Sequence, residues 1–306
     1  MSLKRRELLK VGLCAGASVL LRSGSLLAQP EPLIQKKIPS TGETIPIIGI
    51  GTARRYEEIT TEAGKAPLRG TLREFKELGG KVIDSSPTYG SAEAIVGELV
   101  EELKIRGSLF FATKVSTSGR QAGIDQIQRS FKRLRTAKID LIAVHNLRDT
   151  KTHLQTLREL KQAGRIGYIG ITTSFENQYA EFEQTMKAET LDFIQVDYAL
   201  DNRNADERIL PLAADRGMAA MINLPFGRGR LFNAVQGEKL PEWAADFDCT
   251  TWAQFFLKYI VSHPAVTCAV PGMAKAEYVI DNLGAARGRL PDNATRRRME
   301  KFIDGL

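Results

Sequence analysis

The stretch KVIDSSPTYG, residues 81–90, combines a short apolar run that ends in an acid with a loop that carries a tyrosine five residues later. Two later apolar runs also end in one polar residue each: 109–113 is followed by Lys114, and 139–144 by His145. Lys114 follows Asp84 by 30 residues, and His145 follows Lys114 by 31. A strand–helix–loop unit takes roughly thirty residues. The three polar residues therefore occupy the same position in successive units.

This spacing predicts that the three side chains meet. In a parallel barrel the position after each strand is the C-terminal rim, where active sites are built. We expect Asp84, Lys114 and His145 to converge there, with Tyr89 above the same rim. An acid, an amine, an imidazole and a phenol in one place are suited to proton transfer.

Strands and helices alternate along the rest of the chain, after a hairpin predicted at 33–46. Strands are predicted at 47–52, 81–84, 109–113, 139–144, 167–171, 192–196, 218–224 and 266–271. Helices are predicted at 67–78, 91–104 (with Ser91 as N-cap), 121–134, 152–163, 181–187, 206–215, 252–262 and 275–285. Alternation of this kind indicates a parallel sheet. We expect a single (β/α)8 TIM barrel rather than a doubly wound sheet, because no dinucleotide glycine fingerprint follows the first strand and the polar residues are spread over several strand ends.

The N-terminus has a different character. Residues 1–28 contain the pair Arg5-Arg6, a modestly apolar segment at 11–21 and Ala28 at a plausible cleavage point. This resembles a twin-arginine (Tat) signal, which exports folded bacterial proteins. The sequence thus predicts a signal peptide at 1–28, a barrel domain at 29–306, passage through the Tat export machinery and a periplasmic location.

Charge and composition narrow the possible partners. The formal net charge is +7, but residues 1–28 hold five basic residues and one acidic residue, which leaves the mature chain at about +3. That charge is not the footprint of a nucleic-acid-binding protein. The mature chain contains no run that is long and apolar enough for stable membrane insertion. The Arg296–Arg298 run is expected to lie on a solvated helix face.

The cysteines and histidines do not indicate a metal site. After processing, Cys249 and Cys268 remain, and neither they nor the three histidines of the chain show paired metal-ligand spacing. Cys268 lies in an apolar run and is predicted to be a small buried hydrophobic residue. A disulfide between the two cysteines stays open as an alternative.

The chemistry of the four rim residues follows from their types. A tyrosine pKa lies near 10, and a lysine held beside the phenol is expected to lower it. A buried Lys114 needs a counter-charge, which Asp84 can supply. His145 can donate a hydrogen bond to a carbonyl oxygen, while Tyr89 protonates the alkoxide as it forms. An alkoxide forms when hydride reaches a carbonyl carbon, so a hydride cofactor is implied.

These motifs together resemble the aldo–keto reductase superfamily. The resemblance rests on Asp84 and Tyr89-Gly90, and on Lys114 and His145 after their strands. It also rests on the opening hairpin, on the segments 49–52, 164–170 and 195–198, and on Pro271-Gly272 with Asn282 following. It covers roughly residues 33–290. The resemblance implies an enzyme that reduces a small-molecule carbonyl compound with NADPH, with NADH as the alternative cofactor. It also leaves a second hypothesis open, a non-catalytic nicotinamide-binding subunit that senses redox state or serves as an accessory.

The resemblance also implies which residues hold the cofactor. Gln195, Thr172 and Thr173 would contact the carboxamide, and Tyr198 would stack on the nicotinamide ring. The remaining positions implied along the dinucleotide are Gly51, Thr52, Pro225, Gly227, Arg228, Gly229, Leu231, Gly272, Lys275, Asp281 and Asn282. The segment 225–231 would wrap the pyrophosphate, and its glycines would expose backbone N–H groups. Gly272, Met273 and Tyr278 stand where the family has basic or hydroxyl residues. Lys275, or Arg228 with Arg230, is therefore left to meet a 2′-phosphate.

Four further polar residues follow the first and fourth barrel strands. They are Arg54, Arg55, Asn146 and Arg148. At these positions they are expected to line the mouth of the site and to favour an anionic or polar carbonyl compound.

Overall fold

Eight parallel strands form one sheet in the computed structural model, which describes residues 31–306. Their bounds are β3 (Ile50–Gly51), β4 (Val82–Asp84), β5 (Phe110–Val115), β6 (Ile139–His145), β7 (Ile166–Thr172), β8 (Phe193–Asp197), β9 (Ala219–Asn223) and β10 (Val266–Ala269). They are hydrogen-bonded in chain order from β3 to β10. A separate antiparallel hairpin, β1 (Gln35–Lys37) with β2 (Thr44–Pro46), precedes them. The predicted signal peptide, residues 1–28, lies outside the described residues.

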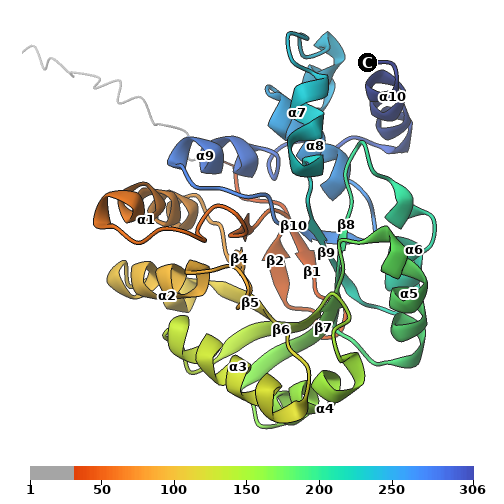
Figure 1. Cartoon of the computed structure of the whole chain (residues 1–306). Helices are drawn as coiled ribbons and strands as arrows, with labels where there is room; N and C mark the ends of the chain where they lie inside the picture. The colour runs from red at the N-terminus through yellow and green to blue at the C-terminus, as the bar shows by residue number, and fades with distance from the viewer. Residues whose placement is uncertain (1–30) are drawn as a thin grey trace, which may run out of the picture. The chain divides into compact units, whose positions relative to one another are not determined.

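Helices follow every barrel strand and surround the sheet (Figure 1). Their bounds are α1 (Glu62–Glu77), α2 (Ala92–Glu102), α3 (Arg120–Arg133), α4 (Thr150–Gln162), α5 (Tyr179–Ala188), α6 (Ile209–Asp215), α8 (Trp252–Val261) and α9 (Ala276–Gly284). A short α7 (Arg230–Ala234) is inserted between β9 and α8, and α10 (Asn293–Asp304) ends the chain. The predicted (β/α)8 barrel with an N-terminal hairpin is therefore confirmed.

The sheet closes where its first and last strands meet. Gly49 N donates to Ala269 O at 2.9 Å, and Gly51 N donates to Pro271 O at 2.9 Å. A Cβ on Gly51 would lie 2.6 Å from Val270 O, so a side chain there would separate the strands. The glycine at this position therefore admits the neighbouring strand, whereas the sequence suggested that it admits a ligand.

Apolar side chains fill the inside of the barrel, and Lys114 lies at the C-terminal end of this interior. Ile38 and Ile45 of the hairpin segment cluster with barrel residues such as Phe110. Along β5, Phe110 and Ala112 belong to this interior cluster. Because side chains alternate along a strand, Lys114 faces inward as well. The inner face of β5 thus ends at the C-terminal rim with the ammonium of Lys114.

The predicted start of α1 was wrong, whereas Ser91 stands at the N-cap of α2 as predicted but does not cap it with its side chain. α1 begins at Glu62 rather than at residue 67, because the Thr61 hydroxyl accepts a hydrogen bond from Gly64 N at 3.2 Å and caps the helix earlier. Ser91 makes no side-chain capping bond to α2. Its hydroxyl instead reaches the carbonyl oxygens of Tyr56 at 3.0 Å and Glu57 at 2.9 Å, because the preceding loop packs against it.

The Arg296–Arg298 run is not uniformly solvated. Arg298 and Arg297 are exposed, but Arg296 is buried between α8 and α10. Its guanidinium donates to Tyr259 O, to Ser262 Oγ at 3.1 Å and to Tyr198 Oη at 2.8 Å. These acceptors explain how a charged side chain is tolerated there.

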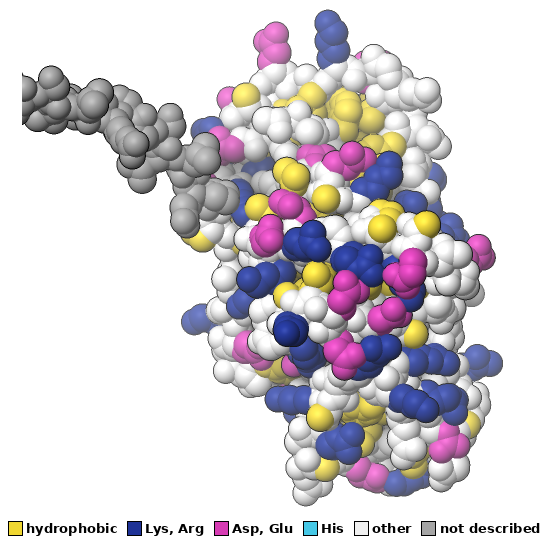
Figure 2. Space-filling view, turned by 90° about the vertical axis from the view of Figure 1, so that its left-hand side faces the viewer, with side chains coloured by type: hydrophobic (Ala, Val, Ile, Leu, Met, Phe, Trp, Pro, Cys, Tyr) yellow, Lys and Arg dark blue, Asp and Glu magenta, His cyan; other side chains and the backbone are white. Residues whose placement is uncertain are grey.

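The helix surface carries charges of both signs. Figure 2 shows basic and acidic side chains interspersed over the face it presents. Between α1 and α2, Lys65 pairs with Glu98 and Arg69 with Glu102, both at 2.7 Å. Across residues 31–306, the helices are all too short or too polar to cross a membrane. Cys249 and Cys268 are buried free thiols, so the alternative of a disulfide between them is not realised.

Candidate active site

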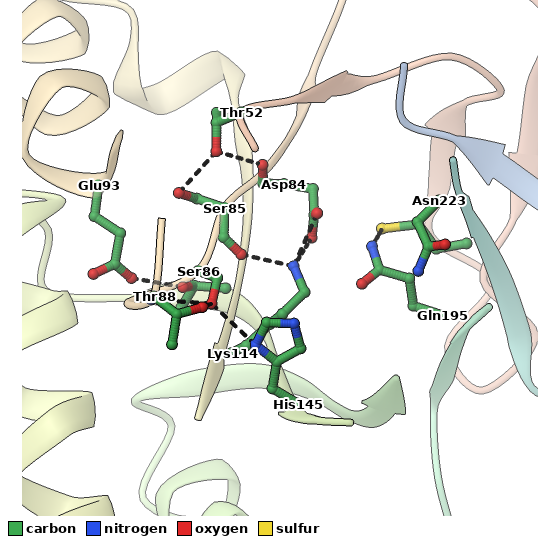
Figure 3. Close-up of polar contacts among 12 residues, drawn as sticks. Thr52, Asp84, Ser85, Ser86, Thr88, Glu93, Lys114, His145, Gln195 and Asn223 are labelled. Atoms are coloured by element: carbon green, nitrogen blue, oxygen red, sulfur yellow. Dashed lines mark hydrogen bonds and ion pairs between the residues drawn. The ribbon is translucent and has the colours of Figure 1, made fainter. Parts of the chain in front are cut away.

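A buried ion pair lies at the C-terminal rim of the barrel. Lys114 Nζ donates to both carboxylate oxygens of Asp84, at 2.8 and 2.9 Å, and to Ser85 O at 2.7 Å (Figure 3). The Lys114 side chain is 2% exposed. Burial alone would lower the pKa of Lys114, but attraction to the Asp84 carboxylate, together with contributions from Tyr89 and Glu93, outweighs burial and holds the pKa above its ordinary value of 10.5. The amine is therefore a buried cation at neutral pH.

Tyr89 stands over this cation. The Lys114 ammonium lies 5.3 Å from the centroid of the Tyr89 ring. The loop that carries Tyr89 is hydrogen-bonded to the loop after β3, because the backbone N–H of Ser91 donates to Glu57 O at 2.9 Å. Gly90, which lies between Tyr89 and Ser91, has φ of +49°. A Cβ on Gly90 would lie 2.3 Å from Glu57 O. The close packing of Gly90 and Ser91 against Glu57 O therefore holds Tyr89 at the rim.

The predicted lowering of the Tyr89 pKa was wrong in its net direction. Burial raises the pKa of Tyr89, and the neighbouring Lys114 charge opposes this without cancelling it. The phenol therefore keeps its proton at neutral pH. A protonated phenol beside a fixed cation can give its proton to an oxyanion and leave a tyrosinate that the cation stabilises.

His145 completes the group as a neutral imidazole. Its ring meets the Tyr89 ring edge to face, with centroids 5.9 Å apart. Burial, helped by the Lys114 charge, lowers the pKa of His145 from 6.5 to about 3. Its Nδ1 lies 3.2 Å from Ser86 Oγ. The four residues predicted to converge at the rim do so.

The opposite wall of the mouth carries amide side chains. Figure 3 shows Gln195 and Asn223 facing Lys114 and His145 from β8 and β9. Gln195 is buried, and its Nε2 contacts only the Met221 sulfur, at 3.3 Å. Asn223 Nδ2 donates to Thr173 O at 3.2 Å, while its Oδ1 is buried without a partner. Asn223 was missed in the sequence, although it continues the inward alternation of Ala219 and Met221.

The last residue of β7, Thr172, and the residue after it, Thr173, are internal. Thr172 and Thr173 are both buried, and Thr173 Oγ1 donates to Gln178 Oε1 at 2.6 Å. Thr52, at the end of β3, donates to Asp84 O and Ser85 Oγ, each at 3.0 Å. Thr52 therefore supports the backbone that presents the Asp84 carboxylate.

A stacking role for Tyr198 does not fit the structure. The side chain is fully buried, and its ring stacks on Tyr259 of α8 at 5.9 Å. Its hydroxyl contacts Asp206, Tyr259 and Arg296. No ring face is therefore left for a nicotinamide.

The segment after β9 forms a turn with three left-handed residues in a row. Gly227, Arg228 and Gly229 have φ of +56°, +57° and +98°. Gly227 and Arg228 border a cavity of about 130 Å³ that Asp197 and Asn202 also line. Pro225 and Leu231 are buried at the two ends of the segment, so Leu231 packs in the core and does not face a ligand.

The positions after β10 differ in exposure. Lys275 is exposed and lies 3.4 Å from Glu277. The Asp281 carboxylate is already hydrogen-bonded to the start of α8, because its Oδ1 accepts from Thr251 Oγ1 at 2.7 Å and from Gln254 Nε2 at 3.0 Å. Asn282 is buried. Of these three, only Lys275 is free to approach a ligand as the structure stands.

Two of the four residues predicted to line the mouth, Arg54 and Arg55, lie near the segment after β10. A Cβ on Gly272 would lie 3.1 Å from Arg55 Cγ, so the exposed Arg55 side chain rests over the β10 end. Arg54 is exposed beside it. Among residues 31–306, no three His, Cys, Asp or Glu side chains gather as a set of metal ligands.

Known proteins resemble the chain over most of its length. The model of the aldo/keto reductase family matches residues 47–301. Aldo-keto reductase YhdN of Bacillus subtilis is 28% identical over 216 residues, which are 66% of this chain and 64% of that protein. Methylglyoxal reductase YeaE of Escherichia coli is 28% identical over 257 residues, 81% of this chain and 88% of that protein.

Solved structures share the fold. An aldo/keto reductase from Klebsiella pneumoniae, in complex with NADP and acetate, has a TM-score of 0.73 at 21% identity and covers 89% of this chain and 96% of its own. The holo form of an aldo-keto reductase from Bacillus halodurans has a TM-score of 0.72 at 22% identity, with the same coverage.

The lowered pKa of His145 predicts that its imidazole stays neutral at pH 5, where an ordinary histidine is charged. Long-range ¹⁵N NMR of the folded protein should show no titration of this ring between pH 8 and 5. The stability that depends on the neutral ring should be complete above pH 6.5 and lost as the pH falls toward 3. His145→Gln assigns the signal, and a midpoint near 6.5 would contradict the prediction.

Proposed function

Because the chain belongs to the aldo/keto reductase family, we propose that it reduces an aldehyde or ketone to an alcohol with hydride from NADPH. One observation carries the proposal. The ring centroid of the protonated Tyr89 lies 5.3 Å from the ammonium of Lys114, which is itself bound to Asp84. Methylglyoxal reductase YeaE, whose name gives a carbonyl compound as its substrate, agrees with this class of reaction.

The residues at the rim fit a nicotinamide dinucleotide. Asn223 Oδ1 has no partner, and Gln195 Nε2 has only a thioether, so both amides have hydrogen-bonding capacity left for a carboxamide. The consecutive left-handed residues at 227–229 make a concave backbone that suits phosphate oxygens. When bound, the cofactor supplies a hydride to the carbonyl carbon.

The chain's own residues then manage the charge on the carbonyl oxygen. His145, being neutral, can donate one hydrogen bond to that oxygen from Nε2 in the tautomer whose Nδ1 accepts from Ser86 Oγ. Tyr89 transfers its phenolic proton to the oxygen as negative charge develops. The resulting tyrosinate is stabilised by Lys114, and Asp84 keeps Lys114 charged and in place. Water outside the mouth returns the proton to Tyr89 after the alcohol leaves.

Tyr89→Phe should lower kcat by about 10²–10⁴-fold, because it removes the general acid and leaves the ring. Tyr168→Phe is the matched control, since it deletes a phenol bonded to Thr41 and Glu43 of the hairpin segment and should keep kcat. Both variants are assayed on a panel of carbonyl compounds with NADPH. Undiminished turnover by Tyr89→Phe would refute the acid role. A wild-type protein that binds NADPH and reduces nothing would favour the non-catalytic redox-sensing subunit.

NADPH is proposed over NADH because Lys275 is exposed after β10, at the N-cap of α9, where a 2′-phosphate is expected. An exposed ion pair contributes up to about 1 kcal/mol, or about fivefold in affinity. Lys275→Ala should therefore weaken NADPH binding several-fold and leave NADH binding unchanged, as measured by titration calorimetry. The control is Lys301→Ala on α10. Equal weakening of both dinucleotides would contradict this contact.

Export by the Tat machinery to the periplasm is proposed from residues 1–28. Replacing Arg5 and Arg6 by lysine should abolish the processed periplasmic form, because the signal is read through its arginine pair. Cell fractionation with mass spectrometry of the N-terminus measures this, and Arg22→Lys is the control. Processed periplasmic protein from the double-lysine variant would argue against this route.

A further inference from the structure

Glu93 is a buried acid that the proposed chemistry does not use. It lies in the first turn of α2, four residues after Tyr89, and is 1% exposed. A carboxylate is removed from water at a cost unless it is bonded. Its Oε1 accepts a hydrogen bond from Thr113 Oγ1 at 2.6 Å, and its Oε2 lies 3.4 Å from a partly exposed Arg133 guanidinium. The short bond to Thr113 is its principal contact.

Thr113 directly precedes Lys114 on β5. Successive side chains of a strand point to opposite faces, so Thr113 faces the helices while Lys114 faces the barrel interior. The bond from Thr113 to Glu93 therefore ties α2 to β5 at the residue next to the ammonium.

The other end of the connection is Tyr89. Ala92 N, at the start of α2, donates to Tyr89 O at 2.9 Å, so the first turn of the helix is built on the tyrosine's own carbonyl. Glu93 is the next residue of that turn. Tyr89 and Lys114 are thus joined outside the barrel by one short chain of contacts, through Ala92, Glu93 and Thr113.

We propose that the Glu93–Thr113 hydrogen bond sets the separation between the Tyr89 ring and the Lys114 ammonium, which makes Glu93 and Thr113 positioning residues for proton transfer. The proposal rests on the proposed function, in which Tyr89 is the acid. Neither residue touches the reacting atoms. They act through the backbone of the two residues that do, and a displacement of about 1 Å between catalytic groups can reduce turnover a hundredfold.

The barrel contains a matched acid that should lack this effect. Asp192 is buried like Glu93, and its Oδ2 accepts hydrogen bonds from Ile169 N at 2.9 Å and Lys161 Nζ at 2.6 Å. It directly precedes β8, at the N-terminal end of that strand and so at the opposite end of the barrel from the rim. Its loss should affect stability without affecting the geometry of Tyr89 and Lys114.

The experiment compares Thr113→Val, Thr113→Ser, Glu93→Gln and Asp192→Asn with the wild type. Kinetics with 4-nitrobenzaldehyde give kcat and KM, fluorescence gives the Kd of NADPH, and calorimetry gives Tm. Thr113→Val should lower kcat at least about tenfold with the Kd of NADPH unchanged. Thr113→Ser restores the hydroxyl and Glu93→Gln keeps an acceptor, so both should stay within about threefold of the wild type. Asp192→Asn should lower Tm and keep kcat.

A readout without turnover makes the two proposals separable. In cofactor-free protein with ¹³C-labelled tyrosine, the Tyr89 signal, assigned with Tyr89→Phe, should move in Thr113→Val but not in Thr113→Ser or Asp192→Asn. An unmoved signal, a kcat within twofold of the wild type in Thr113→Val, or an equal loss of kcat in Asp192→Asn would overturn the positioning role. A wild type that turns over no carbonyl compound would overturn the proposed function, while the NMR signal would still decide the positioning.

Discussion

The buried pair of Lys114 and Asp84 is the interaction on which the site depends. Removing two opposite charges from water costs several kcal/mol for each ion, and only close geometry with further hydrogen bonds offsets that cost. Here the geometry comes from the parallel pairing of β4 and β5, which sets Asp84 against Ala112, two residues before Lys114. The contact to Ser85 O adds a third acceptor for the ammonium. A rigid sheet is thus what allows a cation to be kept dry beside a phenol.

The charge balance around this pair explains the protonation states of its neighbours. The ammonium and carboxylate together are neutral, which leaves the mouth suited to an uncharged carbonyl group. Burial keeps Tyr89 protonated and His145 neutral, and both are then hydrogen-bond donors toward the same space. The site is therefore prepared for negative charge that appears only during a reaction, which is the condition for lowering a barrier without binding the ground state tightly.

Repeat spacing predicted the barrel and the convergence of its four rim residues, because strand–helix units have a nearly constant length. It could not predict contacts between distant segments, so the Ser91 bond to the loop before it and the burial of Arg296 were missed. The sequence did contain a sign that Tyr198 does not face the cofactor side with Gln195. Gln195 and Tyr198 are three residues apart, and in a strand such positions face opposite sides. The same alternation would have placed Asn223 inside the mouth.

Closure of the barrel has a consequence for its synthesis. The residues proposed for catalysis lie between Asp84 and His145, yet β3 obtains its second neighbour only from the segment that includes Ala269 and Pro271. A nascent chain therefore holds every reacting side chain long before it can form a closed rim. Until the last strand leaves the ribosome, both edges of the sheet, at β3 and at β9, are unpaired and the barrel cannot close. The fold makes activity a property of the completed polypeptide.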